Sequence, residues 1–416
     1  MTTVREGGGD GPGMTDPREL ADRVADGDLR LHELEAHAEA DTATAARRVL
    51  LADETGVDLD AVGDYAFDAA AAESNIENMV GAVQVPVGVA GPVPVDGEAT
   101  SGEHYLPLAT TEGGLVAGIN RGCSALAAAG GATARVIESG MTRAPVFRVG
   151  GVAAAQALVE WVDDAEDRLR EAAESTTSHG ELERVDPYVV GDSVFLRFVY
   201  DTKDAMGMNM ATIATEAAAG VVEDETDAEL VALSGNLCSD KKPAAVNAVE
   251  GRGHTVAADA LVPGDVVRER FDADPAAVAE VNARKNFHGS AKAGSLGFNA
   301  HVANAVGAAF LATGQDEAQV VEGSNAITTA SVRDGDLYVS VTLASLPVGT
   351  VGGGTGLPTQ GEALELLGIR GGGDPPGTNA DALAEVVATA ALAGELNLLG
   401  ALAADHLASA HADLGR

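Results

Sequence analysis

The sequence predicts an α+β protein with a large, mostly helical domain built around a long central helix and a small inserted domain of ferredoxin-like β-α-β-β-α-β order. The central helix is predicted over residues 293–315, which carry no formal charge and no proline in a chain that is 22% charged. Ala, Leu, Val and Phe dominate this stretch, which is typical of a buried helix. The inserted domain is predicted over residues 145–233, where extended and amphipathic helical patterns alternate in the stated order.

The central stretch is expected to be protein core rather than a membrane span. As a helix it would measure roughly 34 Å, at about 1.5 Å per residue. A helix that is apolar on every side is either a core element or a membrane span. Asn299, His301 and Asn304 fall inside this one, and they would be costly in hydrocarbon. We therefore expect a buried helix that delivers Asp316, just beyond its end, to the rim of the apolar core.

The charge of the chain is lopsided, since 26 basic and 64 acidic side chains give a net charge of −38. Such a surface repels nucleic acid and anionic membranes, so neither is expected as a partner. The acids are dispersed among periodic apolar residues, which favours a folded protein with an acidic surface adapted to high salt. The melting temperature should then fall on dialysis from molar to millimolar KCl.

Cysteine usage and the start of the chain indicate the compartment. The two cysteines, Cys123 and Cys238, exclude a disulfide framework and a four-cysteine metal site. The acidic, glycine-rich start has neither the basic nor the apolar segment of an export signal. We therefore expect a cytoplasmic protein without a metal site or a membrane span.

The composition and the residue pattern change along the chain and indicate four parts. Residues 1–16 have the composition of a disordered tail, and residues 17–74 the pattern of a helical region. Residues 75–144 and 234–416 share an apolar texture rich in small side chains and are assigned to the large domain. Residues 145–233 interrupt that texture and form the small domain.

The elements of each part are expected as follows. Residues 75–95 are punctuated by Val, Pro and Gly, which indicates short extended pieces joined by turns. Gly113-Gly114 precede a helix rich in small residues. In the small domain, strands are expected at 145–151, 183–190, 192–202 and 230–234, and helices at 153–174 and 208–222.

The last part of the large domain begins with a predicted β-hairpin. Residues 327–350 alternate as two strands around Asp334-Gly335-Asp336. A glycine loop follows at 350–355, and the chain closes with helices from Asn379 to about Ala410.

Lysine is scarce and clustered, which is the best compositional pointer to a site. The chain has five lysines, and four of them lie between residues 241 and 292. Adjacent lysines such as Lys241 and Lys242 usually mark a solvated loop tip, but this composition disfavours surface lysine. A lysine can stabilise an oxyanion, form a Schiff base or place a point charge on an acidic substrate. The residues themselves leave these alternatives open.

Three further stretches carry candidate chemistry. Glu112 is either a helix-capping acid or, if its apolar surroundings bury it, a general acid. His406 and His411 are five residues apart, which does not suit a two-histidine metal pair on a helix, whereas His411 alone could donate a proton from a closing flap. Residues 204–210, DAMGMNM, place a glycine at a helix N-terminus, which suits an anion or a cofactor. No G-x-G-x-x-G motif follows a strand, so a nucleotide site here would not be of the Rossmann type.

Between residue 75 and His411 the chain contains, in this order, the stretches ENMVGAVQVPVGVAGP, PLATTEGGLVAG, DAMGMNM, SGNLCSDKKPAAVN, GFNAHVAN, ATGQDEAQ and TVGGGT. Taken together, and in this order, these stretches resemble the soluble catalytic portion of 3-hydroxy-3-methylglutaryl-CoA (HMG-CoA) reductases, in the form found in eukaryotes and archaea. The resemblance implies an enzyme that reduces HMG-CoA to mevalonate and free CoA with two hydrides from NADPH.

The resemblance also implies roles for four catalytic residues. Lys241 would polarise the thioester carbonyl and stabilise the oxyanion. Glu112 would be a nearby proton source, and Asp316 would bridge the two, so that the three act as a coupled set. His411 would protonate the departing CoA thiolate.

Other residues match binding positions of the family. Those matching the substrate site are Arg143, Ser234, Asp240, Lys242, Lys285, His301 and Asn304. Those matching the cofactor site are Asp204, Ala205, Met206, Gly207, Met208, Asn209, Gly352 and Gly353. The resemblance further implies a homodimer or a dimer of dimers, with ENMVG at the dimer contact and the active site between two subunits. His179 stands where NADPH-preferring relatives commonly have arginine, so the resemblance leaves the choice of NADPH over NADH open.

Two other hypotheses are carried beside the reductase. Lys241 could form a Schiff base in an aldolase-like reaction, which borohydride trapping of an aldehyde adduct would reveal. The chain could instead be a non-catalytic scaffold that binds CoA or an acyl group, with CoA affinity and no NADPH-dependent turnover.

Overall fold

The structure is a computed structural model that describes residues 16–414, with side chains described up to residue 404. It divides into two compact units, Met1–Pro86 with Gly356–Pro358 and Val87–Thr355 with Thr359–Arg416. The tail predicted over residues 1–16 lies outside the described residues except for Asp16. The side chain of Asp16 accepts the Arg18 N–H and so begins the first helix.

The first unit is helical in the part that the structure describes. Its helices are α1 (Pro17–Ala25), α2 (Ala40–Thr55) and α3 (Asp60–Gly63), with short 3-10 turns at Leu31–Ala36 and Ala69–Ala72. Leu20, Leu34 and Ala43 are buried where α1, the first 3-10 turn and α2 meet. Arg47 is buried as well, and it is balanced by Glu35, which accepts two hydrogen bonds of 2.6 Å from its guanidinium.

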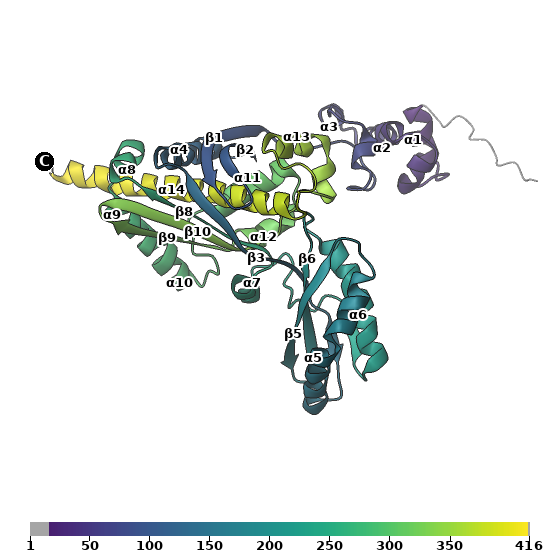
Figure 1. The fold of residues 1–416 in the computed structure, drawn as a ribbon. Coiled ribbons are helices and arrows are strands. Elements are labelled where there is room, and N and C mark those ends of the chain that lie inside the picture. The colour runs from purple at the N-terminus through teal and green to yellow at the C-terminus, as the bar shows by residue number, and fades with distance from the viewer. Residues whose placement is uncertain (1–15, 415–416) are drawn as a thin grey trace, which may run out of the picture. The chain divides into compact units, whose positions relative to one another are not determined.

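A ten-stranded sheet is the framework of the second unit (Figure 1). Its main order is β7-β4-β6-β3-β8-β10-β9, with β1 beside β2 and β3, and β5 beside β6. The strands are β1 (Val87–Asp96), β2 (Ser101–Ala109), β3 (Ala132–Arg143), β4 (Val146–Arg148), β5 (Glu181–Val190), β6 (Ser193–Asp201), β7 (Glu229–Ala232), β8 (Gly253–Val262), β9 (Ala326–Arg333) and β10 (Asp336–Leu346).

Strand β3 belongs to both halves of this sheet. Its residues from Thr133 to Gly140 pair antiparallel with β8, and its last three residues, Met141–Arg143, pair antiparallel with β6. The sheet is therefore continuous from the smaller half, around β6, to the larger half, around β8.

The smaller half consists of β4, α5 (Val152–Glu174), β5, β6, α6 (Met208–Glu225) and β7 in chain order. The two helices pack on each other and enclose a separate apolar cluster with Phe147, Leu158 and Leu196. Strands β5 and β6 form a hairpin whose turn contains Gly191 at a φ of +65°, where the sequence predicts a Gly-Asp turn. These elements occur in the β-α-β-β-α-β order expected from the sequence.

The larger half carries the remaining helices. They are α4 (Leu115–Ala128), α7 (Ala245–Glu250), α8 (Gly264–Phe271), α9 (Pro275–Val281), a π-helical segment (Asn282–Gly289), α10 (Ser290–Ala293), α11 (Val302–Thr313), a 3-10 turn (Glu317–Gln319), α12 (Val320–Gly323), a 3-10 turn (Gly353–Gly356), α13 (Pro358–Leu366) and α14 (Thr378–Leu414).

The predicted central helix over 293–315 is wrong. Helix α10 ends at Ala293 because Gly294 adopts a left-handed φ of +71°, and the helix resumes only at Val302. Between them the backbone of Phe298 bonds to the edge strand β9, donating to Ala326 O at 2.8 Å and accepting from Thr328 N at 2.9 Å. Backbone groups used in this way cannot close helical hydrogen bonds, so an apolar composition alone was misleading.

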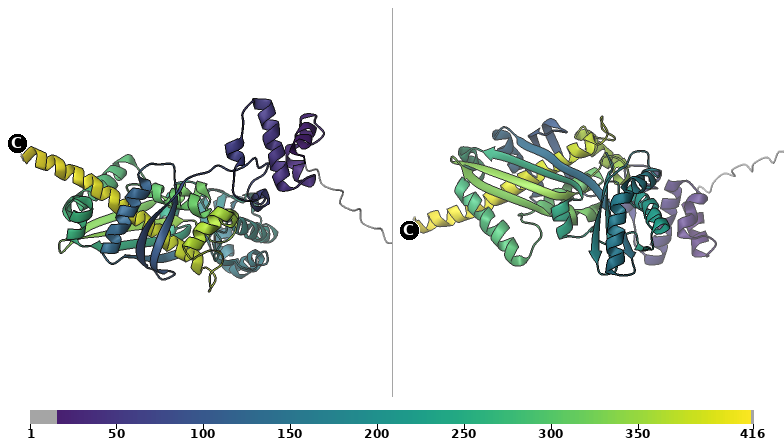
Figure 2. Two further views of the ribbon diagram at one scale, coloured as in Figure 1. Left: turned by 90° about the horizontal axis from the view of Figure 1, so that it is seen from above. Right: turned by 60° about the horizontal axis from the view of Figure 1, so that its bottom comes forward.

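Helix α14 is the long buried helix of the larger half. It packs against α4, β8, α11 and β10, and Figures 1 and 2 show it running the length of the larger sheet. Within the described residues, the segment Thr378–Ala404 is long and apolar enough to cross a bilayer, but 78% of its most apolar window is buried inside the fold. Burial of this kind is expected of a core helix.

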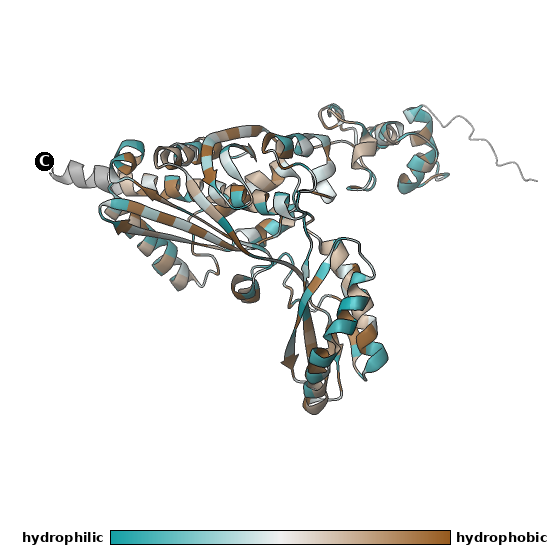
Figure 3. Ribbon diagram, viewed as in Figure 1, coloured by the Kyte–Doolittle hydropathy of each residue, from teal (hydrophilic) through white to brown (hydrophobic). Residues whose placement is uncertain are grey.

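The larger half also has more strand than the sequence indicates. Strands β2, β3 and β8 were not predicted, so the sheet of this half is larger than the sequence indicates, although its helices still contain more residues than its strands. The hairpin around Asp334-Gly335-Asp336 is confirmed, since β9 and β10 pair antiparallel from Arg333↔Asp336 onward. Apolar residues recur along the larger sheet (Figure 3), and alternate residues of β10 are buried against the helices.

Candidate active site

The lysine loop, defined here as residues 234–242, has an unusual backbone. Asn236, Ser239 and Lys241 adopt positive φ angles of 65°, 48° and 59°. This left-handed region is unfavourable for residues with a Cβ atom and tends to occur where surrounding structure imposes it. The loop lies between β7 and α7 and is therefore held by contacts other than helix or sheet pairing.

Lys241 forms an ion pair with Asp316. Its Nζ lies 2.7 Å from Asp316 Oδ2, and the two side chains are 44% and 31% exposed. Gly314, at a left-handed φ of 72°, ends α11 and turns the chain toward Asp316. The other carboxylate oxygen, Oδ1, accepts the Ala318 N–H at 3.1 Å and so caps the following 3-10 turn. The result is an accessible ammonium with a fixed counterion, a group that can stabilise an oxyanion.

Glu112 lies elsewhere on the chain surface. It is exposed in the turn between β2 and α4, where its backbone N–H donates to Thr110 Oγ1 at 3.0 Å. Among the described side chains it makes no ion pair with Lys241, which is paired with Asp316. In the single chain Glu112 is thus exposed, and open space also surrounds the adjoining Gly113 and Gly114. Its role as a proton source stays a prediction.

Glu317, the residue that follows Asp316, is an acid with a shifted pKa. Partial desolvation, together with the adjacent negative charge of Asp316, raises the pKa of Glu317 to about 7. This carboxyl therefore changes its charge close to neutral pH, one residue away from the partner of Lys241.

The predicted substrate residues of the lysine loop are held by local contacts. Ser234 Oγ lies 3.9 Å from Cys238 Sγ, and Asp240 Oδ1 receives Arg252 Nη2 at 2.9 Å. Lys242 is exposed, and its Nζ donates to the backbone carbonyl of Asp240 at 3.0 Å. The loop therefore presents two ammonium groups beside one buried guanidinium.

The other predicted substrate residues lie on three different elements: β3, the π-helical segment, and α11 with its N-cap. Arg143, at the end of β3, donates to Thr212 Oγ1 of α6 at 2.7 and 3.0 Å. Lys285 is exposed on the π-helical segment. His301 Nε2 lies 2.7 Å from the carbonyl of Gly394 in α14, and its Nδ1 lies 3.4 Å from Asn304 Nδ2. Both ring nitrogens of His301 thus have partners within the chain.

Asp204 is buried at the start of the cofactor loop, defined here as residues 204–209. Its carboxylate accepts four backbone N–H groups from the segment that leads into α14, those of Gly373, Gly377, Asn379 and Ala380, at 2.8–3.2 Å. It therefore caps the N-terminus of α14 from outside the helix. With these oxygens committed, any contribution of Asp204 to cofactor binding would be the position of the loop.

The cofactor loop lies directly beside the glycine loop, residues 350–355. Ala205 forms a parallel β-bridge with Val351, and the Asp204 carbonyl accepts the N–H groups of Thr350 and Val351 at 2.8 and 3.2 Å. Gly207 has a φ of 81° at the start of α6. In the glycine loop, Gly352 and Gly353 also have positive φ, and nothing lies within 4 Å of a Cβ built on either.

These two loops make a surface suited to phosphates. The N–H groups at the start of α6 and the side-chain-free glycines allow the backbone to approach an anion closely. Met206, Met208 and Asn209 fall on the same turn as Gly207. The residues present therefore fit a dinucleotide phosphate arm.

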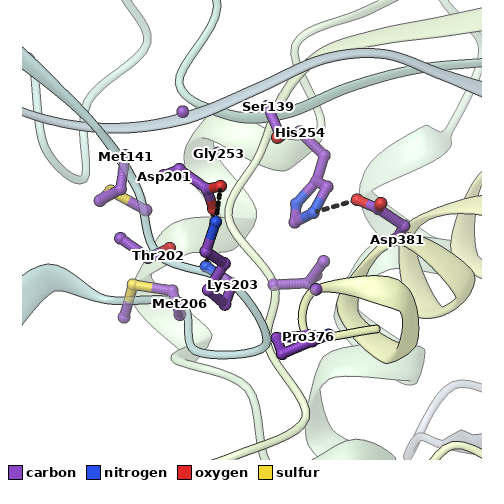
Figure 4. A pocket seen from close by; sticks show the side chains of 13 residues that line it. Ser139, Met141, Asp201, Thr202, Lys203, Met206, Gly253, His254, Pro376 and Asp381 are labelled. Atoms are coloured by element: carbon purple, nitrogen blue, oxygen red, sulfur yellow. Dashed lines mark hydrogen bonds and ion pairs between the residues drawn. The ribbon is translucent and has the colours of Figure 1, made fainter. Parts of the chain in front are cut away.

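A small polar cavity adjoins the start of the cofactor loop (Figure 4). Its volume is about 100 Å³, and it contains the pair of His254 Nε2 with Asp381 Oδ1 at 3.1 Å and the pair of Lys203 Nζ with Asp201 Oδ2 at 2.5 Å. Ligand sites for cofactors usually exceed about 300 Å³, so this cavity is too small for a dinucleotide.

The sequence analysis missed a buried charge network behind the lysine loop. Glu322 and Arg252 are both 0% exposed and pair at 2.8 Å. Burial raises the pKa of Glu322, whereas the Arg252 guanidinium and the Lys241 N–H favour its charged form. The available signal was one acid, Glu322, standing alone between Glu317 and Arg333.

The fourth predicted catalytic residue, His411, falls on α14 beyond residue 404, and its side chain lies outside the part that the structure describes. The lysine loop and the two glycine-containing loops have the features of an α+β enzyme that reduces a carbonyl group with a dinucleotide cofactor. An ammonium paired with a carboxylate can stabilise a carbonyl oxyanion, and two adjacent glycine-containing loops can hold a dinucleotide.

Comparison with known proteins identifies the family. A family model described as hydroxymethylglutaryl-coenzyme A reductase matches residues 43–416. The 3-hydroxy-3-methylglutaryl-coenzyme A reductase of Haloferax volcanii is 72% identical over 403 residues, which cover 97% of this chain and 100% of the relative. That of Halobacterium salinarum is 68% identical over 402 residues, covering 96% and 99%. The chain belongs to the hydroxymethylglutaryl-coenzyme A reductase family.

A solved structure agrees with this fold. The class II 3-hydroxy-3-methylglutaryl-CoA reductase from Streptococcus pneumoniae bound to NADPH in open conformations matches with a TM-score of 0.64. It covers 80% of this chain and 89% of its own chain at 22% identity, so it supports the fold alone.

Proposed function

We propose that this chain reduces the thioester of HMG-CoA to mevalonate and free CoA, using two hydrides from NADPH. The reaction and the cofactor follow from its family, whose members of up to 72% identity span its length. The observation that carries the site assignment is the Lys241–Asp316 ion pair at 2.7 Å on a loop of left-handed backbone. The haloarchaeal relatives and the DKKPAA stretch support the eukaryotic and archaeal class.

Lys241 is the electrophilic group of the proposed mechanism. Its ammonium would stabilise the oxyanion that forms when the thioester carbonyl, and later the aldehyde carbonyl, accepts hydride. Asp316 would hold the ammonium in place, and Glu112 would supply a proton. An ammonium held 2.7 Å from a carboxylate is a poor nucleophile, which disfavours the Schiff-base alternative.

NADPH supplies hydride when bound, and the chain's own residues would hold it. We assign this role to residues 204–209 of a small NADPH-binding domain over residues 145–233, together with Gly352 and Gly353 of the large domain. The strand order β7-β4-β6-β5 supports a ferredoxin-like domain. Arg143, Ser234, Asp240, Lys242, Lys285, His301 and Asn304 are assigned to HMG-CoA binding.

The test is loss of nicotinamide absorbance in high KCl. NADPH oxidation should depend on HMG-CoA, with two NADPH consumed for each free CoA thiol released. Parallel runs with NADH determine whether His179 permits either cofactor. CoA binding without any NADPH oxidation would favour a scaffold instead.

His411 is proposed to protonate the CoA thiolate. His411→Gln should lower kcat on HMG-CoA by about 10²–10⁴-fold, as expected of a lost general acid. Reduction of free mevaldehyde, which releases no thiolate, should lose less. Equal losses on both substrates would contradict this role.

The active site is proposed to lie between two subunits of a cytoplasmic homodimer or dimer of dimers. Support comes from Glu112, which is exposed and makes no ion pair with Lys241 among the described residues. The test mixes Glu112→Gln subunits with Lys241→Ala subunits after dissociation. A shared site would restore about a quarter of wild-type activity in a random mixture, because half of the dimers would have one intact site. No restoration would place both residues in one subunit.

A further inference from the structure

The lysine loop requires something to hold its unfavourable backbone. Three residues with a Cβ atom, Asn236, Ser239 and Lys241, occupy the left-handed region within six positions. The Lys241–Asp316 ion pair is partly exposed to solvent, and such pairs alone hold a backbone weakly. A second contact holds the loop at the backbone of Lys241, whose N–H group donates a hydrogen bond to a buried carboxylate.

That contact is made by Glu322, on the short helix α12. Its side chain is fully buried, and its Oε1 accepts the Lys241 N–H in a short hydrogen bond. Its Oε2 accepts from Arg252 Nη1 at 2.8 Å, from Asn247 Nδ2 at 3.2 Å and from Ser345 Oγ at 3.2 Å. Three of these groups can only donate, and the Ser345 hydroxyl lies within hydrogen-bond distance of both Glu322 Oε2 and the Arg252 carbonyl, at 3.2 and 3.1 Å, so the surroundings match an ionised carboxylate.

The same network holds the two residues before Lys241. Asn247 Nδ2 also donates to the Ser239 carbonyl at 3.2 Å, and Arg252 Nη2 donates to Asp240 Oδ1 at 2.9 Å. Ser239, Asp240 and Lys241 are thus each tied to Glu322 or to a direct partner of Glu322. The buried carboxylate is the common point of these contacts.

We propose that Glu322 is a positioning residue for the reduction: it holds Lys241 in the left-handed backbone that directs the ammonium to Asp316 and the reacting carbonyl. It acts through Lys241 and does not touch the substrate. The inference rests on the proposed function, because it assumes that Lys241 stabilises the oxyanion.

Glu385 provides a matched control. It is also a fully buried glutamate, and it also accepts backbone hydrogen bonds, from Glu98, Ala99 and Thr100 at 2.9–3.2 Å. Its partners lie in the turn between β1 and β2 and none belongs to the lysine loop. Replacing either glutamate by glutamine removes a buried charge, but only one replacement disturbs Lys241.

The experiment compares Glu322→Gln, Lys241→Ala, the double variant and Glu385→Gln in the full chain. A glutamine at 322 points an amide N–H at one of the four donors, which releases Lys241 or Arg252. Glu322→Gln should lower kcat by about 10²-fold, as expected of a misplaced catalytic group, with the KM for NADPH within about twofold of wild type. Glu385→Gln should lower the melting temperature comparably and keep kcat within about twofold.

The double variant separates positioning from a general loss of structure. If Glu322 acts through Lys241, Glu322→Gln should cause no further loss of kcat in the Lys241→Ala background. Losses that multiply, or a Glu322→Gln kcat no lower than that of Glu385→Gln, would overturn the proposal. Absence of HMG-CoA-dependent NADPH oxidation in the wild-type chain would instead overturn the proposed function.

A milder variant covers the case in which Glu322→Gln does not fold. Ser345→Ala removes a hydroxyl that lies 3.2 Å from Glu322 Oε2 and 3.1 Å from the Arg252 carbonyl, and it leaves both charges of the buried pair in place. It should lower kcat by about two- to fivefold, and this loss should vanish in the Lys241→Ala background. Wild-type kcat in Ser345→Ala would overturn the proposal in that case.

Discussion

The lysine loop and the cofactor loop are both anchored by one buried carboxylate, but in opposite senses. In the lysine loop, the body of the fold supplies the carboxylate, Glu322, and the loop supplies the N–H of Lys241. In the cofactor loop, the loop supplies the carboxylate, Asp204, and the body supplies four N–H groups at the start of α14. In both loops, charge-assisted hydrogen bonds to a buried carboxylate add to the packing of side chains such as Met206 and Cys238 in fixing the backbone.

This difference predicts which kinetic constant should change when each loop is disturbed by substitution. The lysine loop places a single side chain, so its disturbance should appear in kcat. The cofactor loop is proposed to place backbone groups around the phosphate arm of NADPH, so its disturbance should appear in the KM for NADPH. Variants on the two loops can break or sharpen this contrast.

The largest effect is expected on the lysine loop itself. Lys241→Ala should lower kcat by about 10²–10³-fold or more, because it removes the proposed oxyanion donor. The KM for NADPH should change little. Steady-state rates with each substrate varied in turn provide the measurement, and an unchanged kcat would remove Lys241 from the mechanism.

A smaller effect of the other kind is expected on the cofactor loop. Asp204→Asn replaces one acceptor oxygen by an amide N–H that faces backbone donors, so two N–H groups at the start of α14 lose their partner. The KM for NADPH should rise about tenfold, with a lower melting temperature. Glu385→Gln also removes an acceptor of backbone N–H groups. It should lower the melting temperature as Asp204→Asn does, but its KM for NADPH should equal that of the wild type. If Asp204→Asn lowered only kcat, the contrast between the loops would fail.

The smallest effect is expected beside Asp316. The pKa of Glu317 is raised to about 7 from a usual value of 4.5, so the folded state favours its protonated form. Its stabilising contribution is complete below about pH 4.5 and is lost as the pH rises through 7. Glu317→Gln and wild type should therefore melt alike at the acidic end, and the variant should melt about 2 °C higher at pH 8. A difference independent of pH would exclude this carboxyl as the cause.

Local patterns predicted the elements whose structure is local. The Asp334-Gly335-Asp336 turn and the elements of residues 145–233 could be read from the sequence, because turn residues and periodicity determine them. The 293–315 helix could not, since Phe298 bonds to β9 in another part of the chain. Strands β3 and β8 pair with each other across more than a hundred residues, and no short window reports that pairing.

The site shows the same division. Lys241 and Asp316 were brought together by resemblance to a family, and the structure has them 2.7 Å apart. The supporting pair, Arg252 and Glu322, is 70 residues apart in sequence. No sequence motif links the two residues, so their contact could not be predicted. The exposure of Glu112 in the single chain could not be predicted either, because an apolar sequence neighbourhood does not report the open space around a glycine turn.

Strand β3 connects the proposed substrate site to the smaller half of the sheet. Met141, Thr142 and Arg143 of β3 pair with β6, so this junction is three residue pairs wide. Arg143 is the last of the three and donates to Thr212 Oγ1 of α6. If Arg143 binds the substrate as proposed, a rotation of the smaller half that separates β3 from β6 would also move its guanidinium.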